Sequence, residues 1–468
     1  MLRLLVKKLM KGSKMRIGLI SKWAAASVVV LTALAAGAPA GAQPIVQGGG
    51  GLPSQPGTII NRPVPQTTAP QSIYQLTTAS RAVLVPIGQT QGHPFVAMRR
   101  ALHPNFSSES VLHSFAGTDG AAPQGASEQF NVSPVKLLGT AAAGGSTANG
   151  TAWRLVVSPL SFSDMHNFTG PDGSGPVNLS GTGASIGVAQ FGGAHSMGAV
   201  YKITPSGNVM VLHSFAGVDG AQPLGNPLSF VDGCIYGTTS TGGSFGFGTI
   251  WQICGAKFRT LHSFNENAGE GGEPTAGLSV AIKGLSLSPN LYGTTQHGGT
   301  PGGAGTIYGV SPSSGAVTTL FSFDGGPNGG NPMAELTPDF SGNLFGTANG
   351  GGLGIGTAFR FSLTLGTLSV LFTFGSDNPL GAANPVAPLA FDASGNLFGT
   401  APFGGNPNQG GVVFELPAGG GYSQLWSFGA GTDGVNPLGP VVVGTDGSLY
   451  GTTQVGGVNF DGAIWRLQ

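Results

Sequence analysis

Short apolar runs alternate with Gly-rich and polar turns from Val111 to Gln468, and the same order of runs recurs about seven times. The unit at 233–264 shows it well, with apolar runs in IYGTT, GTIWQI and LHSF separated by turns. Runs of five or six alternating residues bounded by Gly, Asp, Asn and Pro predict strands rather than helices. A fourth, weaker run such as PLSFV at 227–231 precedes them. Each unit therefore predicts four short strands.

An L-x-x-F phrase marks each repeat and sets its period. It occurs at 112–115, 165–168 (with Met in place of Leu), 212–215, 261–264, 320–323, 371–374 and 425–428. The spacing between successive Phe residues runs from 47 to 59 positions. A period near 50 is typical of four-stranded propeller blades and not of helical solenoids.

The two ends of the repeat array complement each other. The first unit starts with the L-x-x-F strand at 111–115, and the last stops after its third strand at 462–467. Pairing these two segments would complete one blade and remove the exposed edges of an open array. We therefore expect an all-β, seven-bladed β-propeller over 111–468, closed by its N- and C-terminal strands. The alternatives are an open solenoid or a ring with one blade more or fewer.

The N-terminal region has a different composition. Residues 1–42 combine basic residues, the apolar run at 24–38 and an A-x-A site ending at Ala42, which predicts an export signal starting at Met1 or Met15. A retained anchor is the alternative, although the run is short for a membrane span. Residues 43–71 are rich in Pro, Gly and Gln and predict a flexible linker. Residues 72–110 are either an extra strand or an ordered lead-in. We expect a secreted or periplasmic monomer.

Charge limits the possible partners. The 468 residues include 84 Gly, and only 8% are charged, with 19 basic and 19 acidic residues. This balance is too weakly basic for a protein that follows nucleic-acid phosphates. A near-neutral surface favours a polysaccharide or protein ligand over an anionic one. Apart from the segment at 24–38, no apolar run is long enough to cross a bilayer.

The chain has two cysteines, Cys234 and Cys254. If the runs 234–239 and 248–254 form a hairpin, the two residues lie opposite each other at its open end. A disulfide there would close a loop of about 20 residues and contribute roughly 3 kcal/mol in the chain-entropy model. Two separate buried thiols are the alternative, and two cysteines alone are a poor metal site.

In a four-stranded blade, the D-G-x-x-P turn and the T-x-x-G-G loop emerge on the same face of the ring. We expect a ligand site there or at the channel mouth. Residues repeated in every blade are best explained by the needs of the fold, so candidates come from the irregular positions. Aromatic rings could stack on a sugar or a partner protein, or be buried under the loop. The candidate residues are Phe191, His195, Phe245, Phe247, His297 and Phe403.

Other polar residues carry weaker hypotheses. The turn aspartates Asp119, Asp172, Asp219 and Asp433 supply one carboxylate per turn, which is too few to favour calcium, and we expect no cofactor. The regular strand histidines predict packing or hydrogen bonding rather than catalysis: His113, His166, His213 and His262. Glu335 and Asp339 lie near an innermost strand and could face the channel, with solvation as the alternative.

The phrases IYGTTSTGG (235–243), LYGTTQHGG (291–299) and LYGTTQVGG (449–457) resemble the repeat of the bacterial choice-of-anchor tandem repeat GloVer-containing proteins. The resemblance covers residues 111–468 and implies an exported protein. The family provides no catalytic residues to transfer, and the chain departs from it in having no visible C-terminal anchor.

Two functions are compatible with these sequence features. The first is a structural or binding role at the cell envelope, with a glycan or protein held by the loop face. The alternative is a hydrolase or lyase acting on extracellular polysaccharide at the channel mouth. An enzyme should break the sevenfold regularity with a cluster of unlike acidic, His or Tyr side chains, and the sequence reveals no such cluster. We therefore favour binding over catalysis.

Overall fold

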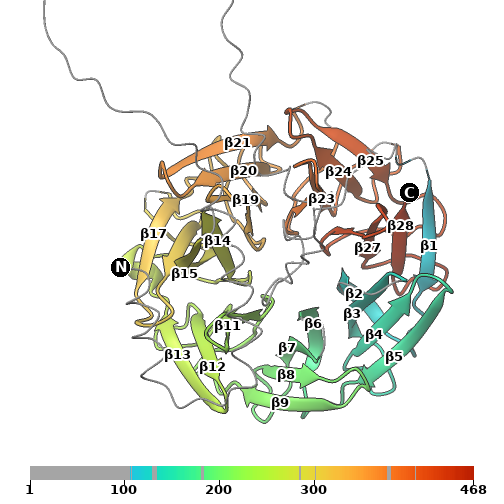
Figure 1. Ribbon diagram of the computed structural model, residues 1–468, viewed down its shortest axis with the longest axis horizontal. Coiled ribbons are helices and arrows are strands. Elements are labelled where there is room, and N and C mark those ends of the chain that lie inside the picture. The colour runs from blue at the N-terminus through green and yellow to red at the C-terminus, as the bar shows by residue number, and fades with distance from the viewer. Residues whose placement is uncertain are drawn as a thin grey trace, which may run out of the picture. The chain divides into compact units, whose positions relative to one another are not determined.

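The computed structural model describes residues 106, 108–128, 134–180, 184–283, 286–300, 302–376, 381–405 and 407–468. The predicted signal at 1–42, the linker at 43–71 and most of the 72–110 segment lie outside them. The described chain forms seven four-stranded antiparallel sheets around a central axis, with the first strand of each innermost (Figure 1). The predicted seven-bladed propeller is confirmed. One 3-10 turn, η4 (Glu266–Ala268), interrupts the otherwise all-β pattern of the described residues.

The blades follow one another in chain order, and we number them 1 to 7. Blade 1 contains β2 (Ala121–Glu128), β3 (Lys136–Ala143), β4 (Thr151–Val156) and β5 (Ser161–Asn167). Blade 2 contains β6 (Ser174–Ser180), β7 (Ser185–Phe191), β8 (Ala199–Ile203) and β9 (Val209–Ser214). Blade 3 contains β10 (Leu228–Ser229), β11 (Cys234–Thr239), β12 (Thr249–Cys254) and β13 (Lys257–Ser263). Blade 4 contains β14 (Ser279–Lys283), β15 (Ser286–Thr295), β16 (Thr306–Val310) and β17 (Val317–Ser322).

The last three blades, like blade 3, have innermost strands of two residues. Blade 5 contains β18 (Thr337–Pro338), β19 (Asn343–Ala348), β20 (Thr357–Ser362) and β21 (Thr367–Thr373). Blade 6 contains β22 (Ala390–Phe391), β23 (Leu397–Ala401), β24 (Val412–Leu416) and β25 (Ser423–Ser427). Blade 7 contains β26 (Val442–Val443), β27 (Leu449–Thr453), β28 (Ala463–Leu467) and β1 (Glu109–Ser114).

Blade 7 closes the ring with strands from both ends of the described chain. β1 pairs antiparallel with β28, which confirms the predicted closure. The pairing extends beyond β1, because Ser108 N donates to Gln468 O (3.2 Å) and Gln468 N to Ser108 O (3.1 Å). The Phe106 ring makes an edge contact with Phe398, with ring centroids 6.0 Å apart. The closing segment therefore begins several residues before 111.

Large aromatic residues fill the space between neighbouring blades. The last Phe of every L-x-x-F phrase is fully buried, as are Trp153, Trp251 and Trp465 in the third strands. The Gly of the G-T-T phrase makes room for these rings, since a Cβ on Gly139 would lie 2.2 Å from the Trp153 ring. Burial of each such side chain contributes about 1.5–3 kcal/mol. The apolar alternation that predicts the strands thus also builds the core.

A Gly–Pro contact joins each blade to the next. The Gly before the third strand has a positive φ in every blade and packs against a Pro that lies before, or near the start of, the innermost strand of the next blade. A Cβ on Gly462 would lie 2.4 Å from Pro123 Cδ, and one on Gly248 would lie 2.7 Å from Pro274 Cδ. Repetition of these residues is therefore explained by the ring itself.

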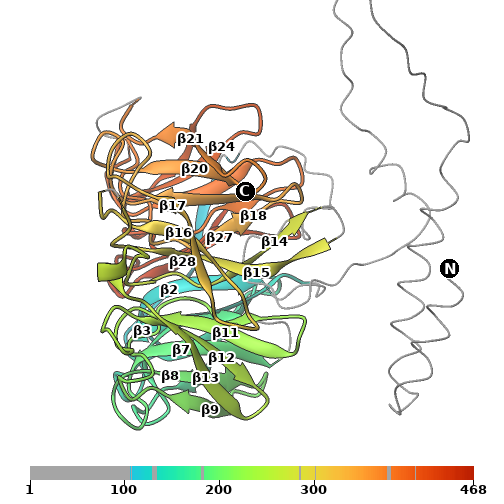
Figure 2. The same ribbon diagram turned by 90° about the vertical axis from the view of Figure 1, so that its left-hand side faces the viewer.

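Cys234 and Cys254 occupy directly opposed positions on β11 and β12. They are joined by a disulfide, with their Cα atoms 4.4 Å apart. The bond connects the strand ends that lie away from the Gly-rich loop of blade 3. It therefore fastens the blade at its end opposite that loop (Figure 2 gives the side view of the blades).

Candidate binding face

The turns between blades and the Gly-rich loops between second and third strands lie together, and we call the surface that they form the loop face. Backbone hydrogen bonds join the two sets of segments. Gly145 N donates to Gly117 O at 2.7 Å, and Gly243 N donates to Gly217 O at 2.8 Å. The expectation that the turn and the loop emerge on the same face is therefore met.

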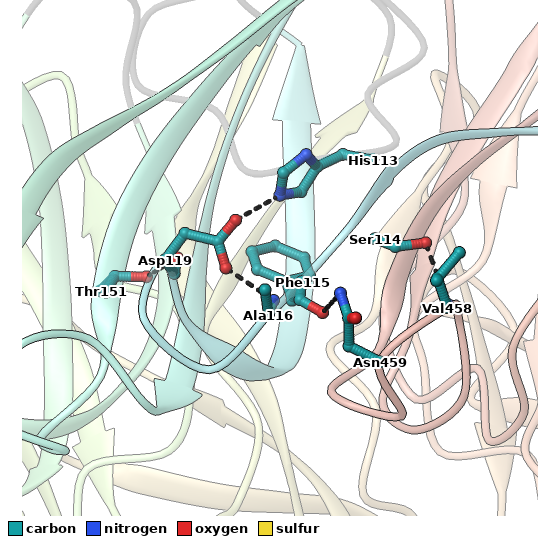
Figure 3. Close-up of polar contacts among 8 residues, drawn as sticks. All are labelled: His113, Ser114, Phe115, Ala116, Asp119, Thr151, Val458 and Asn459. Carbon is teal, nitrogen blue, oxygen red and sulfur yellow. Dashed lines mark hydrogen bonds and ion pairs between the residues drawn. The ribbon is translucent and has the colours of Figure 1, made fainter.

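The strand histidines and turn carboxylates form pairs near the outer edge of this face. His113 Nε2 lies 2.8 Å from Asp119 Oδ2, while Ala116 N donates to the other oxygen of Asp119 at 2.8 Å (Figure 3). The same arrangement recurs at 2.7 Å in His166–Asp172 and His213–Asp219, and at 3.1 Å in His262–Glu270. In blade 7, Trp426 Nε1 donates instead to Asp433 Oδ2 at 3.3 Å. His113, His166 and His213 have the hydrogen-bonding role that their regularity predicts. His262 Nε2 faces Glu270 in the same way but has no hydrogen-bond partner among the described residues.

Burial and hydrogen bonding act in opposite directions on the pKa values of these pairs. Burial lowers the pKa of His113 below its ordinary value, and the neighbouring Asp119 opposes this shift. For Asp172, burial acts to raise the pKa, but hydrogen bonds from Thr169 and His166 together hold it below its ordinary value. The pairs thus help to hold the turns in which they occur.

Closer to the axis, one residue per turn adopts a left-handed backbone directly before the Pro. Its N–H donates to the Gly-rich loop of the preceding blade, as in Gln222 N to Met197 O (2.9 Å) and Asn436 N to Gly410 O (2.8 Å). Because the backbone is fixed in this way, the side chain is free to vary. The seven positions hold Ala122, Gly175, Gln222, Glu273, Asn331, Asn384 and Asn436.

A second set of residues lies beside the first. Each directly precedes the Gly-Gly pair of its loop and is bridged to the turn of its own blade, as in Gly272–His297 and Ala383–Phe403. These bridges continue the pairing of the innermost and second strands, so both sets surround the central axis at the loop face. We call them together the inner rim. The second set holds Ala143, Phe191, Thr241, His297, Gly350, Phe403 and Val455.

The candidate aromatic residues divide between exposed and covered positions. Phe245 and Phe403 are each 54% exposed, and Phe191 is exposed as well. Phe247 is partly buried against a core cluster. His195 is exposed at its loop, and His297 is half-buried on the inner rim. Phe460, which is 78% exposed in the Gly-rich loop of blade 7, was not predicted from the sequence. The sequence feature that could have identified Phe460 is an apolar residue inside a Gly-rich loop.

The two acidic residues near β18 have separate environments. Glu335 is buried, and Asn226 Nδ2 lies 3.4 Å from its Oε2. Solvation is therefore the wrong interpretation for Glu335. Asp339 lies in the hairpin between β18 and β19, where its Oδ1 accepts hydrogen bonds of 2.8 Å from Ser341 N and Asn343 N. Asp339 has a turn-forming role.

One place on the inner rim breaks the regularity with unlike polar side chains. His297 Nε2 lies 3.5 Å from Glu273 Oε2, and Asn331 Nδ2 lies 3.4 Å from His297 Nδ1. The side chains of His297 and Glu273 are 39% and 41% exposed. No such cluster was expected from the sequence, and the structure corrects that expectation: residues from two turns and one loop meet between blades 4 and 5. We call these three residues the rim cluster.

Fold and loop face together define a β-propeller repeat protein. Residues 100–287, 179–382 and 354–468 match the model of the Gloeobacter/Verrucomicrobia repeat. The chain therefore belongs to the Gloeobacter/Verrucomicrobia repeat family, in agreement with the resemblance noted from its sequence. A search of curated proteins found no match.

Solved propellers show a distant similarity. Oligogalacturonate lyase from Vibrio parahaemolyticus is 11% identical, with a TM-score of 0.47 over 77% of this chain and 93% of that one. TolB from Acinetobacter baumannii is 15% identical, with a TM-score of 0.37 over 58% of each chain, so the match spans less than two thirds of TolB. Similarities of this size carry no information about activity. Among the described residues, no helix is long and apolar enough to span a membrane.

Proposed function

We propose that the protein is an exported binding module that recognises a glycan or protein through its loop face. The observation that carries this proposal is the placement of exposed aromatic residues. Five Phe residues among the described ones are well exposed, and four of them lie on the loop face: Phe191 at the end of β7, directly before a Gly-rich loop, and Phe245, Phe403 and Phe460 within such loops. Exposed aromatic rings on a rigid scaffold supply contact area with little loss of conformational entropy on binding.

The backbone of the loop face supports this role. Its turns and loops are connected by hydrogen bonds and Gly–Pro contacts around the ring, so a ligand would meet a preformed surface. Ser108 and Gln468 pair at the opposite ends of the blade 7 strands. The described chain therefore enters the propeller away from the loop face.

The test is a glycan array and a capture assay for cell-envelope proteins, both with the purified mature protein. Phe245→Ala and Phe403→Ala should each weaken binding by about tenfold, the effect of losing roughly 1.4 kcal/mol. Phe340→Ala is the matched control, because Phe340 is an exposed ring in the hairpin between β18 and β19, at the opposite end of the blade. Equal effects of all three substitutions, or no binding of either ligand class, would refute the proposal.

A second function, catalysis on an extracellular polysaccharide, is favoured by one observation, the pairing of Glu273 with His297. A carboxylate beside an imidazole is a common arrangement for proton transfer. A depolymerisation assay with the polysaccharides that the protein binds distinguishes the two functions. Turnover that is lost in Glu273→Gln would establish catalysis, whereas saturable binding without turnover supports the binding module.

A further inference from the structure

We propose that Glu273, His297 and Asn331 form a subsite that binds the hydroxyl groups of a neutral sugar at the inner rim, between blades 4 and 5. This inference rests on the proposed function and makes it more specific, because it selects a neutral glycan over a protein and assigns the polar contacts. The juxtaposition of the three side chains, from two turns and one loop, is its basis.

Comparison of equivalent positions sets this place apart. The two inner-rim positions of a blade hold Ala122 and Ala143 in blade 1, and Gly175 and Phe191 in blade 2. In blade 4 the same two positions hold Glu273 and His297, which gives the inner rim its carboxylate and its imidazole. Every blade requires the same backbone conformation and hydrogen bonds at these two positions. The fold therefore does not explain why blade 4 has different side chains there. A small number of convergent polar groups at one place is what a single ligand site provides.

The backbone holds the rim cluster in place without using its side chains. Glu273 N donates to Phe247 O at 2.8 Å, and Glu273 O accepts from Gln296 N at 3.1 Å. Two further bonds pair Gly272 with His297, at 3.0 and 3.2 Å. Asn331 N donates to Ala304 O at 2.7 Å. The three side chains therefore project from fixed positions, which lowers the entropy cost of binding.

The side-chain contacts within the rim cluster are weak enough to be replaced. Both the 3.5 Å Glu273–His297 distance and the 3.4 Å His297–Asn331 distance exceed the usual range for a strong hydrogen bond. A carboxylate accepts several hydrogen bonds, a side-chain amide both donates and accepts, and imidazole can do either. Adjacent hydroxyl groups on a sugar ring offer both donors and acceptors, so they match this set.

An aromatic loop lies next to the rim cluster. Phe247 packs its Cβ against Gly272, since a Cβ built on Gly272 would lie 3.1 Å from it. Phe245, two residues earlier in the same loop, is exposed. A sugar has an apolar face as well as hydroxyl groups, so a loop with an exposed ring beside polar groups suits it better than either feature alone.

Charge selects the kind of sugar. The Glu273 carboxylate is partly exposed, and an acidic sugar placed beside it would meet like charge. The chain carries 19 basic and 19 acidic residues, so it has no net positive charge to offset that repulsion. The subsite should therefore prefer neutral polysaccharides to polyuronates.

The experiment measures binding of the mature protein to a neutral β-glucan, a mannan and starch, with polygalacturonate and alginate for comparison, by affinity electrophoresis and calorimetry. Glu273→Gln, His297→Ala and Asn331→Gly should each weaken binding of the preferred neutral polysaccharide by about tenfold. Asn436→Gly is the matched control for Asn331→Gly, because both Asn residues have a left-handed backbone, with φ values of 53° and 58°. The control should bind within twofold of the unchanged protein.

Each outcome decides the inference. Selective weakening by the three substitutions, with polyuronates bound more weakly, supports it. Neutral-sugar binding that the three substitutions leave unchanged but Phe403→Ala weakens would overturn it, and the proposed function would stand. Capture of a protein ligand without any polysaccharide would likewise overturn the inference and leave the proposed function standing. Binding of neither class overturns both proposals. Polysaccharide cleavage that Glu273→Gln abolishes without weakening binding would show that the rim cluster is catalytic, which also overturns the inference.

Discussion

We predict that Glu109 makes closure of the ring sensitive to pH. It begins β1, opposite Leu467 of β28, and its Oε1 is buried without a hydrogen-bond partner among the described residues. Burial, with a smaller contribution from the negative charge of Asp433, raises the pKa of Glu109 from 4.5 to about 7. The folded protein therefore favours the protonated carboxyl, and ionisation at neutral or alkaline pH weakens the closing strand.

The size and sign of the effect follow from linkage. A pKa raised from 4.5 to about 7 would correspond to roughly 3 kcal/mol for a fully buried group. Because the side chain is only about half-buried, solvent screening reduces this to about 1–2 kcal/mol. The folded pKa lies above the unfolded one, so this stabilising contribution is fully present below pH 4.5 and is lost as the pH rises through 7.

Glu109→Gln keeps the size of the side chain and removes the charge. Urea unfolding at pH 5, 6, 7 and 8 should show the variant gaining about 1–2 kcal/mol over the unchanged protein at pH 8. The gain should shrink steadily toward pH 5. Asp461→Asn, which removes a loop-face carboxylate at the other end of the closing blade from Glu109, is the control for the loss of one negative charge from this blade. A stability difference that is constant over this pH range, or a variant that is less stable at pH 8, would refute the reasoning.

Three further experiments test the closure of the ring and the disulfide. Removing the disulfide with Cys234→Ser and Cys254→Ser should lower the free energy of unfolding by about 3 kcal/mol, and identical urea midpoints with and without reductant would contradict this. Gly462→Ala should cost more than about 2 kcal/mol because its Cβ would meet Pro123, whereas Gly447→Ala, also at positive φ but in open space, should cost less. Phe106→Ala should cost about 1–2 kcal/mol and speed hydrogen exchange at Gln468 N, and unchanged exchange would refute the anchoring role.

The propeller was predictable because its strongest physical requirements are repeated. Each blade needs a Phe in the core, a Gly beside the third-strand aromatic and a Gly–Pro contact with its neighbour, so the same letters recur at a fixed period. The need to cover open strand edges then predicts that 111–115 pairs with 462–467. The extension to Phe106 was not predictable, because its contact with Phe398 depends on a side chain outside the repeat.

Exposure of the loop residues was harder to predict. Phe245 and Phe247 are two positions apart in one loop, yet Phe245 is exposed while Phe247 is partly covered by blade 4. A loop has no hydrophobic period from which the side-chain direction could be derived. For the same reason, Phe460 was missed. Glu335 was misjudged because its burial depends on how closely the innermost strands approach one another.

The rim cluster shows where a repeat protein can carry a specific function. Glu273 and His297 are 24 positions apart and have ordinary neighbours in sequence, so no local motif marks them. Their contact follows from register, since the residue before the Pro and the residue before Gly-Gly adjoin in every blade. The backbone hydrogen bonds at both positions are independent of the side chain, as the alanines of blade 1 show. Substitution there can change the ligand without weakening the ring, and these two positions are where ligand specificity should be sought.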